Sequence, residues 1–157
     1  MRRSERIGKA GEYYVCFILS QLSDLVCLVP HGSHADIVFE WKDKLYKCQV
    51  KTVSKRNRVI SKHTGKIYRT NYKFELRRGS HTKNRTYEED HNDIYALFII
   101  PLKKVIFLPG NLKKQSFRFS RTEAEQISTK DSFLDSVQQR LNEKIIYFKK
   151  LDIDSYF

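Results

Sequence analysis

Two β-rich segments joined by a very short turn limit what this chain can fold into. Residues 35–41 (ADIVFEW) and 45–53 (LYKCQVKTV) are rich in β-branched and aromatic side chains, and only three residues separate them. Strand-forming segments this close in sequence pair as an antiparallel hairpin. Because side chains alternate along a strand, Gln49 and Lys51 share one face of the second strand, while Cys48 points to the other face.

The rest of the chain predicts the helices and strands that accompany this hairpin. Apolar residues recur at intervals of three and four near both ends of the chain, which is typical of amphipathic helices, and short apolar runs between them are typical of strands. The expected elements are a helix over 7–22, a short buried strand over 25–29, strands over 93–100 and 105–108, an edge strand over 115–121, and a helix over about 131–147 with Phe133, Leu134, Val137, Leu141 and Ile145 on its buried face. Ser120 and Glu123 form a capping-box pattern for a further short helix. This order predicts an α/β (α+β) fold, one domain over 1–157, with a mixed central sheet flanked by helices.

The net charge of +12 is concentrated in one part of the chain. Residues 51–85 contain twelve lysines and arginines against a single acid, Glu75, so this segment alone carries +11. Solvated surfaces normally mix both signs, because like charges repel one another. The concentration indicates a polyanionic partner, and nucleic acid is favoured over a membrane surface because no basic amphipathic helix accompanies the charge.

The basic segment, about 54–85, also contains a second hairpin pattern. Residues 58–61 and 66–69 flank the turn 62–65, which ends in a glycine. A two-stranded ribbon of this kind can enter the major groove of DNA. The candidate DNA-binding residues are Lys55, Arg56, Arg58, Lys62, Lys66, Arg69, Lys73, Arg77 and Arg78.

Cysteine usage and hydropathy indicate where such a protein works. The three cysteines, Cys16, Cys27 and Cys48, form no CxxC pair, which predicts reduced, mostly buried thiols rather than a disulfide framework or a zinc site. No apolar run approaches the roughly 18 residues that a membrane span requires, and the basic N-terminus does not lead into an apolar signal segment. We therefore expect a cytoplasmic protein that does not act in a membrane.

The first hairpin also brings together groups suited to phosphodiester cleavage. Cleavage by a metal ion needs carboxylates, a carbonyl-type oxygen and a cation near the attacking water. Asp36 begins the first strand, and Gln49 and Lys51 lie on the strand that returns beside it, so the three lie toward the same end of the hairpin. Glu12, in the first predicted helix, is a further candidate acid.

With these residues the chain resembles the PD-(D/E)XK nuclease superfamily. Its pattern is a helical Glu, an Asp entering a hairpin and a (D/E)-x-K on the next strand; here the matching residues are Glu12, Asp36 and Gln49-Val50-Lys51. Ala35 replaces the nominal proline, and Gln49 replaces the acid, so that one ligand brings no negative charge. The resemblance implies a restriction-endonuclease-like core over 8–53, with Glu12, Asp36, Gln49 and Lys51 catalytic. It also implies Mg²⁺, with Mn²⁺ as a substitute, bound by Asp36, Gln49, Val50 and Glu12.

Within that superfamily, the size and the QxK variant resemble the compact homing endonucleases encoded in group I introns. The resemblance implies a magnesium-dependent, site-specific double-strand DNA endonuclease that acts as a homo-oligomer, a dimer or a tetramer. The alternatives are a restriction-like endonuclease and a structure-specific or catalytically weak DNA-binding protein of the same fold, similar to a Holliday-junction resolvase.

Several residues have competing interpretations. Asp36 and Lys51 could form an ordinary surface ion pair. His31 and His34 flank Asp36 and are candidates to contact the site or a phosphate, whereas the alternative is exposed loop histidines; an HNH nuclease would need histidines much closer together. Asp93 is interpreted as an acid capping the start of a strand rather than as a further metal ligand.

Overall fold

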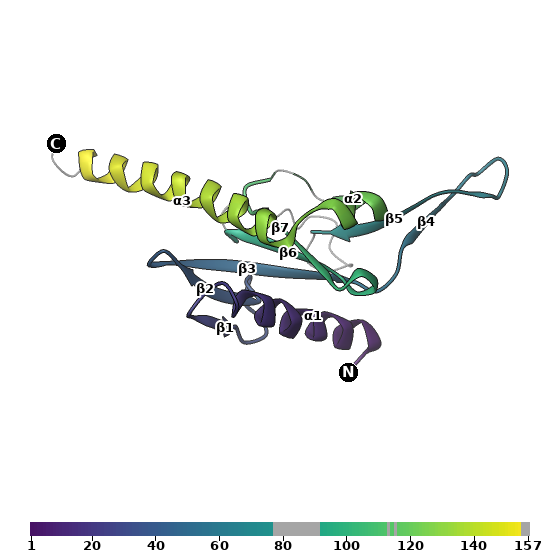
Figure 1. The fold of residues 1–157 in the computed structure, drawn as a ribbon, viewed down its shortest axis with the longest axis horizontal. Coiled ribbons are helices and arrows are strands. Elements are labelled where there is room, and N and C mark those ends of the chain that lie inside the picture. The colour runs from purple at the N-terminus through teal and green to yellow at the C-terminus, as the bar shows by residue number, and fades with distance from the viewer. Residues whose placement is uncertain (77–91, 113, 115, 155–157) are drawn as a thin grey trace.

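The computed structural model describes residues 1–76, 92–112, 114 and 116–154, with the backbone alone for 144–154. Its elements are α1 (Arg3–Leu19), β1 (Val26–Leu28), β2 (Ile37–Trp41), β3 (Lys44–Val53), β4 (Asn57–Ile60), β5 (Ile67–Glu75), β6 (Ile94–Ile99), a 3-10 turn (Ile100–Leu102), β7 (Lys104–Pro109), β8 (Ser116–Phe119), α2 (Arg121–Gln126) and α3 (Thr129–Asp154). Within the described residues, five strands form one sheet in the order β1-β2-β3-β6-β7, and β4, β5 and β8 form a second sheet (Figure 1).

The β2–β3 hairpin is confirmed. Its strands pair antiparallel from Ile37 opposite Cys48 to Trp41 opposite Lys44. The two residues between the strands, Lys42 and Asp43, have φ values of 49° and 59°. Positive φ at both central positions is the geometry of a two-residue hairpin turn whose twist matches that of the strands. β3 then pairs in parallel with β6, which makes the sheet a mixed one.

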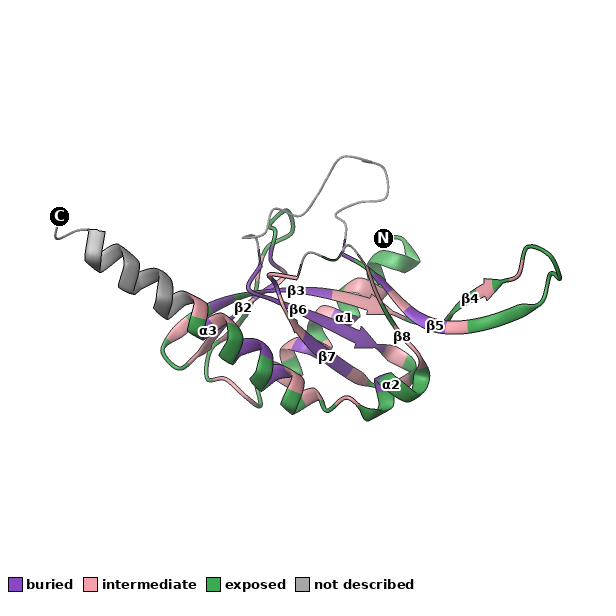
Figure 2. Ribbon diagram, turned by 90° about the horizontal axis from the view of Figure 1, so that it is seen from above, coloured by how far each residue is buried: buried purple, intermediate pink, exposed green. Residues whose placement is uncertain are grey.

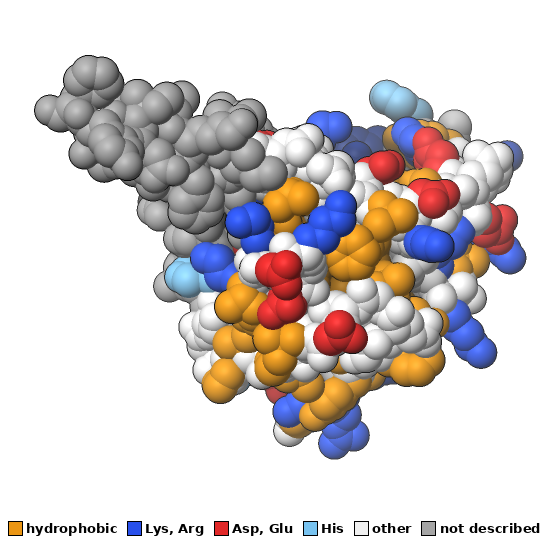
Figure 3. All heavy atoms as spheres, turned by 60° about the vertical axis from the view of Figure 1, so that its left-hand side comes forward, with side chains coloured by type: hydrophobic (Ala, Val, Ile, Leu, Met, Phe, Trp, Pro, Cys, Tyr) orange, Lys and Arg blue, Asp and Glu red, His pale blue; other side chains and the backbone are white. Residues whose placement is uncertain are grey.

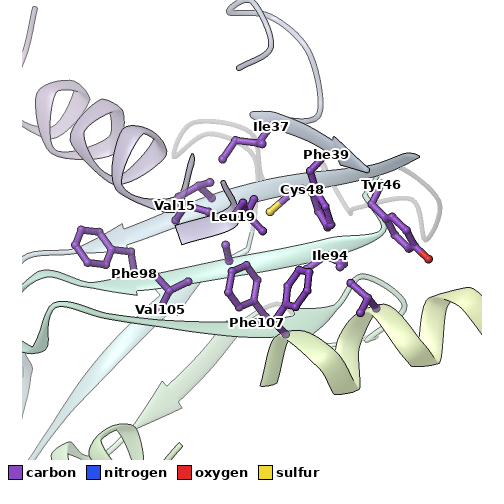
Figure 4. Close-up of a cluster of buried hydrophobic side chains, with 14 residues drawn as sticks. Val15, Leu19, Ile37, Phe39, Tyr46, Cys48, Ile94, Phe98, Val105 and Phe107 are labelled. Atoms are coloured by element: carbon purple, nitrogen blue, oxygen red, sulfur yellow. The ribbon is translucent and has the colours of Figure 1, made fainter. Parts of the chain in front are cut away.

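The two faces of the five-stranded sheet bury two different clusters. On one face, which we call the helical face, α1 and α3 pack against alternate residues of the strands. Val15 and Leu19 of α1 belong to the same buried cluster as Cys48 and Phe107 (Figure 4). Phe133 of α3 packs edge-on against the Phe107 ring. The intervening residues face β5, β8 and α2 on the other side, which we call the ribbon face. β6 supplies both clusters, and all six of its residues are buried, as expected for a central strand.

β4 and β5 form the ribbon predicted in the basic segment. They pair antiparallel from Asn57 opposite Asn71 to Ile60 opposite Ile67, with a β-bulge after Val59. The ribbon extends away from the rest of the structure and is largely exposed beyond its base (Figure 2). The inner half of β5 pairs with β8 instead and lies against the central sheet. The expected edge strand at 115–121 is therefore present, on the second sheet.

Three local predictions need correction. The strand over 25–29 is not buried, because β1 is the edge of the sheet and both Cys27 and Leu28 are exposed. Leu134 is 36% exposed although the helical pattern places it with Phe133. The buried side of α3 runs through Phe133, Val137 and Leu141 and does not include Leu134. The C-terminal helix is also longer than expected.

Other expectations agree with the fold only in part: the first helix, expected over 7–22, spans Arg3–Leu19, Cys27 is exposed, and the side chain of Ile145 lies outside the described part of the chain. Ser120 caps α2 through a capping box with Glu123. All three cysteines are free, one of them buried and one half-buried. None of the helices, as far as they are described, is long and apolar enough to cross a membrane. The polar composition of residues 79–92 predicts a loop, and all of this segment except Asn92 lies outside the described residues.

Candidate functional site

A notch in the central sheet brings the candidate residues together. β2 begins at Ile37, but β3 continues past this point to Val53 along β6. Asp36 lies at the corner: its backbone N–H donates to the carbonyl of Cys48 at 2.9 Å, and its Oδ2 accepts the backbone N–H of Val50 at 2.7 Å. The Asp36 carboxylate is thus held against the edge of β3 just where the ladder to β2 stops.

The same hydrogen bond fixes the direction of a backbone carbonyl. In an extended strand, the N–H and C=O of one residue point to the same side of the strand. The N–H of Val50 points to Asp36, so its carbonyl points to that side too, beyond the last residue pair of β2 and β3. One carboxylate and one carbonyl oxygen therefore share the notch.

Gln49 places a buried amide on β3, one residue before Val50. It lies beside Tyr95 in the parallel pairing of β3 with β6 and is only 6% exposed. Its Oε1 accepts no hydrogen bond from any part of the chain that the structure describes. Leaving a buried acceptor unsatisfied costs about 1–3 kcal/mol, so such an atom in a native fold calls for a partner. A cation is one partner that an amide oxygen can accept.

Glu12 approaches the notch from α1. Burial raises the pKa of its carboxyl, and the nearby Asp36 carboxylate raises it further, whereas Lys9 and His31 lower it. A carboxyl whose pKa is raised by burial and by a neighbouring carboxylate favours a bound cation, which would relieve both the desolvation and the repulsion. His31 is therefore close enough to Glu12 to affect its charge.

The position of α1 depends on a close contact that the sequence interpretation missed. A Cβ atom added to Gly11 would lie 1.9 Å from Oγ1 and 3.0 Å from Cβ of Thr52, on β3. Only glycine lets the helix come this near to the strand, and it places the following residue, Glu12, beside the notch. Glycine inside a helix is unfavourable by about 1 kcal/mol relative to alanine, so its presence there is the signal that could have revealed the contact.

The other sequence candidates lie around this centre in different ways. Lys51 is half-buried on β3, on the same face as Gln49. The backbone carbonyl of His34 accepts the Asn92 amide at 3.2 Å, which ties the loop before Asp36 to the start of β6. Buried Asn92 was not singled out from the sequence, because its role depends on a partner 58 positions away.

Asp93 has a structural role at the start of β6. Its Oδ2 accepts the backbone N–H of Lys47 at 2.8 Å, and its Oδ1 lies 3.6 Å from the guanidinium of Arg140 on α3. This agrees with the interpretation of Asp93 as an acid that caps the start of a strand.

The donors at the notch suit a hard divalent cation. They are two carboxylates, an amide oxygen and a backbone carbonyl, and Mg²⁺ prefers oxygen ligands while keeping several of its waters. No group of three or more His, Cys, Asp or Glu residues that could hold a metal occurs in the described part of the chain. A metal here would therefore depend on the neutral oxygens of Gln49 and Val50 in addition to the acids.

A basic cleft lies next to this centre, where β3 leads into the ribbon. It has a volume of about 810 Å³ and is lined by Thr52, Val53, Ser54, Lys55, Arg56, Asn57, Arg58, Thr70 and Lys73. The Arg56 guanidinium donates to Oγ1 of Thr70 at 3.4 Å across the ribbon. Of the other candidate DNA-binding residues, Lys62, Lys66 and Arg69 lie farther along the ribbon, while Arg77 and Arg78 lie outside the described residues.

A mixed sheet with α1 and α3 on one face, and with β5, β8 and α2 on the other, defines an α+β fold. Among solved structures, the chain is similar to the bacterial homing endonuclease I-Ssp6803I, with a TM-score of 0.60 and 18% sequence identity, over 92% of this chain and 97% of that one. At this identity the likeness shows the fold. No known family model matches the sequence, and no curated protein matches it.

Proposed function

We propose that this protein is a magnesium-dependent, site-specific double-strand DNA endonuclease of the homing type, with a PD-(D/E)XK site in its QxK form. The observation that carries the proposal is the buried Gln49 amide oxygen, which accepts no hydrogen bond within the described residues. Gln49 directly precedes Val50 on β3, and the backbone N–H of Val50 donates to the Asp36 carboxylate. The fold that holds them is similar to that of a homing endonuclease.

Each residue of the notch has a role in this proposal. Glu12, Asp36, Gln49 and the Val50 carbonyl would hold Mg²⁺, or Mn²⁺ in its place. The ion would supply Lewis-acid stabilisation of the charge that develops on the phosphate. Lys51 orients the attacking water and donates to the phosphate oxygens as their charge grows.

The basic cleft and ribbon give the proposal its substrate. The cleft begins at Thr52, one residue after Lys51, so a DNA backbone bound in it would pass directly beside the notch. Phosphate contacts from lysine and arginine fix the position of DNA on a protein and provide most of the salt-dependent affinity.

Cutting both strands of a duplex requires two such sites, so we propose that the protein acts as a homo-oligomer. Large apolar side chains support this, because Tyr13 and Phe17 on α1 and Leu25 and Leu28 at β1 are all more than a third exposed. Figure 3 shows apolar side chains reaching the surface between charged groups on one face of the molecule. Light scattering coupled to size exclusion would give the mass; a monomer at working concentration would contradict this part.

Cleavage of a random-sequence DNA library with Mg²⁺, read by sequencing the ends, tests the activity. We expect Asp36→Asn and Lys51→Ala to lower cleavage by about 100-fold or more, with DNA binding retained. Asparagine can still accept the Val50 N–H, so the first variant isolates the lost charge. The matched control is Asp43→Asn, in the β2–β3 turn, which should cleave like the wild type. Cleavage by Asp36→Asn near the wild-type rate would refute the site.

One observation favours a second candidate, a catalytically weak or structure-specific DNA-binding protein of this fold, similar to a junction resolvase. Gln49 gives the site one negative charge fewer than an acid there would give, which weakens a metal site. Binding to four-way junctions in preference to linear duplexes, without end-specific products from the library, would identify this alternative. Recurrent cut sites that share a sequence would exclude it and would leave a homing or a restriction-like enzyme.

A further inference from the structure

The outer end of the ribbon carries apolar side chains that no part of the described structure covers. Ile60 on β4 and Ile67 on β5 are cross-strand partners, 56% and 49% exposed, and Tyr68 in the adjoining bulge is 69% exposed. None of the three belongs to either of the two buried clusters. A ribbon of two strands has no core of its own, so this pair gains little from packing within the protein.

Cations surround this apolar pair. Arg58 lies two residues before Ile60 on the same strand, so its side chain leaves the ribbon on the same face. Lys62 and Lys66 lie in and beside the turn that follows. A protein partner that covered the isoleucines would bury these charges, whereas a polyanion would pair with them. The charge around the pair thus favours nucleic acid as its occupant.

The floor of the major groove offers one apolar group, the C5-methyl of thymine. A two-stranded ribbon fits this groove, and side chains at its outer end reach base edges while basic residues along its sides reach phosphates. An isoleucine pair on that face has no hydrogen-bonding capacity, so it can distinguish bases only through contact with a methyl group.

We infer that Ile60 and Ile67 are specificity-determining residues that contact thymine methyl groups in the major groove of the target site. The inference rests on the proposed function for its DNA partner, but it concerns recognition and not cleavage. It requires a target site with a preference for T·A pairs at one or more positions beneath the outer end of the ribbon.

Binding without metal tests this independently of cleavage. The full chain is incubated in EDTA with a random duplex library, the bound fraction is sequenced, and the consensus duplex is then made with thymine or with uracil at its preferred T positions. Uracil lacks only the methyl group. We expect the wild type to bind the uracil duplex about fourfold more weakly per buried methyl.

Two variants connect this difference to the ribbon. Ile60→Ser/Ile67→Ser should bind both duplexes equally, and Ile60→Thr/Ile67→Thr, which keeps the β-branched shape, should show a reduced difference. The matched control is Val59→Ser, one position along β4 on the opposite face, which should keep the full difference.

The inference fails if the wild type binds the two duplexes equally, a result that does not depend on the folding of any variant. It also fails if the difference persists in the serine double variant. A change in oligomeric state without a change in the thymine-to-uracil ratio would show a self-association surface instead, and would overturn it. Failure to cleave, with thymine-dependent binding intact, would count against the proposed function alone. If the wild type binds no DNA, both proposals fail.

Discussion

At the scale of single residues, the strength of the proposed metal site depends on Gln49. A carboxylate at this position would add a negative charge to those of Glu12 and Asp36, whereas the amide offers only a dipole. If the buried oxygen is a metal ligand, Gln49→Glu should keep activity and tighten Mg²⁺ binding, so that cleavage saturates at a lower metal concentration. Gln49→Leu, which has no oxygen, should be inactive.

The stability of Gln49→Leu is the control for its expected loss of activity. Leucine relieves the unsatisfied acceptor, so thermal unfolding without metal should show that Gln49→Leu is at least as stable as the wild type. Loss of activity in a stable protein would then reflect a lost ligand. An active Gln49→Leu enzyme would instead show that this residue is structural.

The raised pKa of Glu12 predicts how the stability of the protein changes with pH. Its folded-state pKa is raised above 4.5 by burial and by Asp36, so the folded protein binds this proton more tightly than the unfolded chain does. The ionised carboxylate therefore destabilises the metal-free fold. This effect is absent below the unfolded-state value, grows as the pH rises between the two pKa values, and is complete above the folded-state value.

Glu12→Gln should accordingly raise the melting temperature of the metal-free protein at pH 7 to 8, and the gain should disappear toward pH 4. Glu40→Gln on β2 is the matched control, for which we expect no such trend. Saturating Mg²⁺ should stabilise the wild type more than Glu12→Gln, because the ion offsets the charge of the carboxylate. A pH-independent effect of Glu12→Gln would contradict the raised pKa of this carboxyl.

At the scale of elements, α1 carries two glycines that should respond oppositely to the same substitution. A Cβ at Gly8 meets no atom within 4 Å, whereas one at Gly11 overlaps Thr52. Gly8→Ala should therefore stabilise the protein by up to about 1 kcal/mol through helix propensity, with cleavage unchanged. Gly11→Ala should push α1 away from β3, lower the melting temperature, and reduce cleavage because Glu12 moves with the helix.

Differential scanning calorimetry and the cleavage assay separate the two glycines. Thr52→Ala removes the Oγ1 that lies nearest to the added Cβ, so combining it with Gly11→Ala should recover part of the stability. Equal gains from both single glycine variants would mean that the close approach of α1 to β3 is not required.

The elements that could be predicted from the sequence are those whose cause is local. A two-residue turn between alternating strands determines the β2–β3 hairpin, and a capping box determines the start of α2. The burial of β1 was predicted wrongly, because an apolar strand at the edge of a sheet looks the same in sequence as one in its middle. The pairing of β8 with β5 likewise depends on contacts that no local pattern contains.

The same distinction applies to the candidate site. The positions of Asp36 and Gln49 on one hairpin followed from strand spacing and alternation. The burial of the Gln49 oxygen and the contact of Gly11 with Thr52 depend on how β6 and α1 pack on β3, and neither could be read from the chain alone.

At the scale of the whole molecule, most of the described basic residues between Lys55 and Lys73 lie away from the proposed metal ligands. The basic residues between Lys55 and Lys73 lie in the cleft and along the ribbon, which extends away from the central sheet and α1 (Figures 1 and 2). In the proposed function, one part of the molecule would hold most of the DNA while the notch would act on one phosphate. Binding and cleavage should respond separately to mutation.

The salt dependence of DNA binding measures this separation. Each phosphate that a cation neutralises releases condensed counterions, and the slope of log affinity against log salt concentration changes by about 0.9 per contact. Lys55→Ala in the cleft and Lys62→Ala near the end of the ribbon should each reduce the slope by about one, weakening all sequences alike. Lys42→Asn, in the turn at the opposite end of β3, removes the same charge far from the ribbon and should leave the slope unchanged. Equal changes in all three variants would show that the net charge of +12, and not its placement along the ribbon, governs binding.

With Mg²⁺ and DNA both saturating, the lysine variants should cleave at the wild-type rate, because the cations that hold the duplex are not those that act on the phosphate.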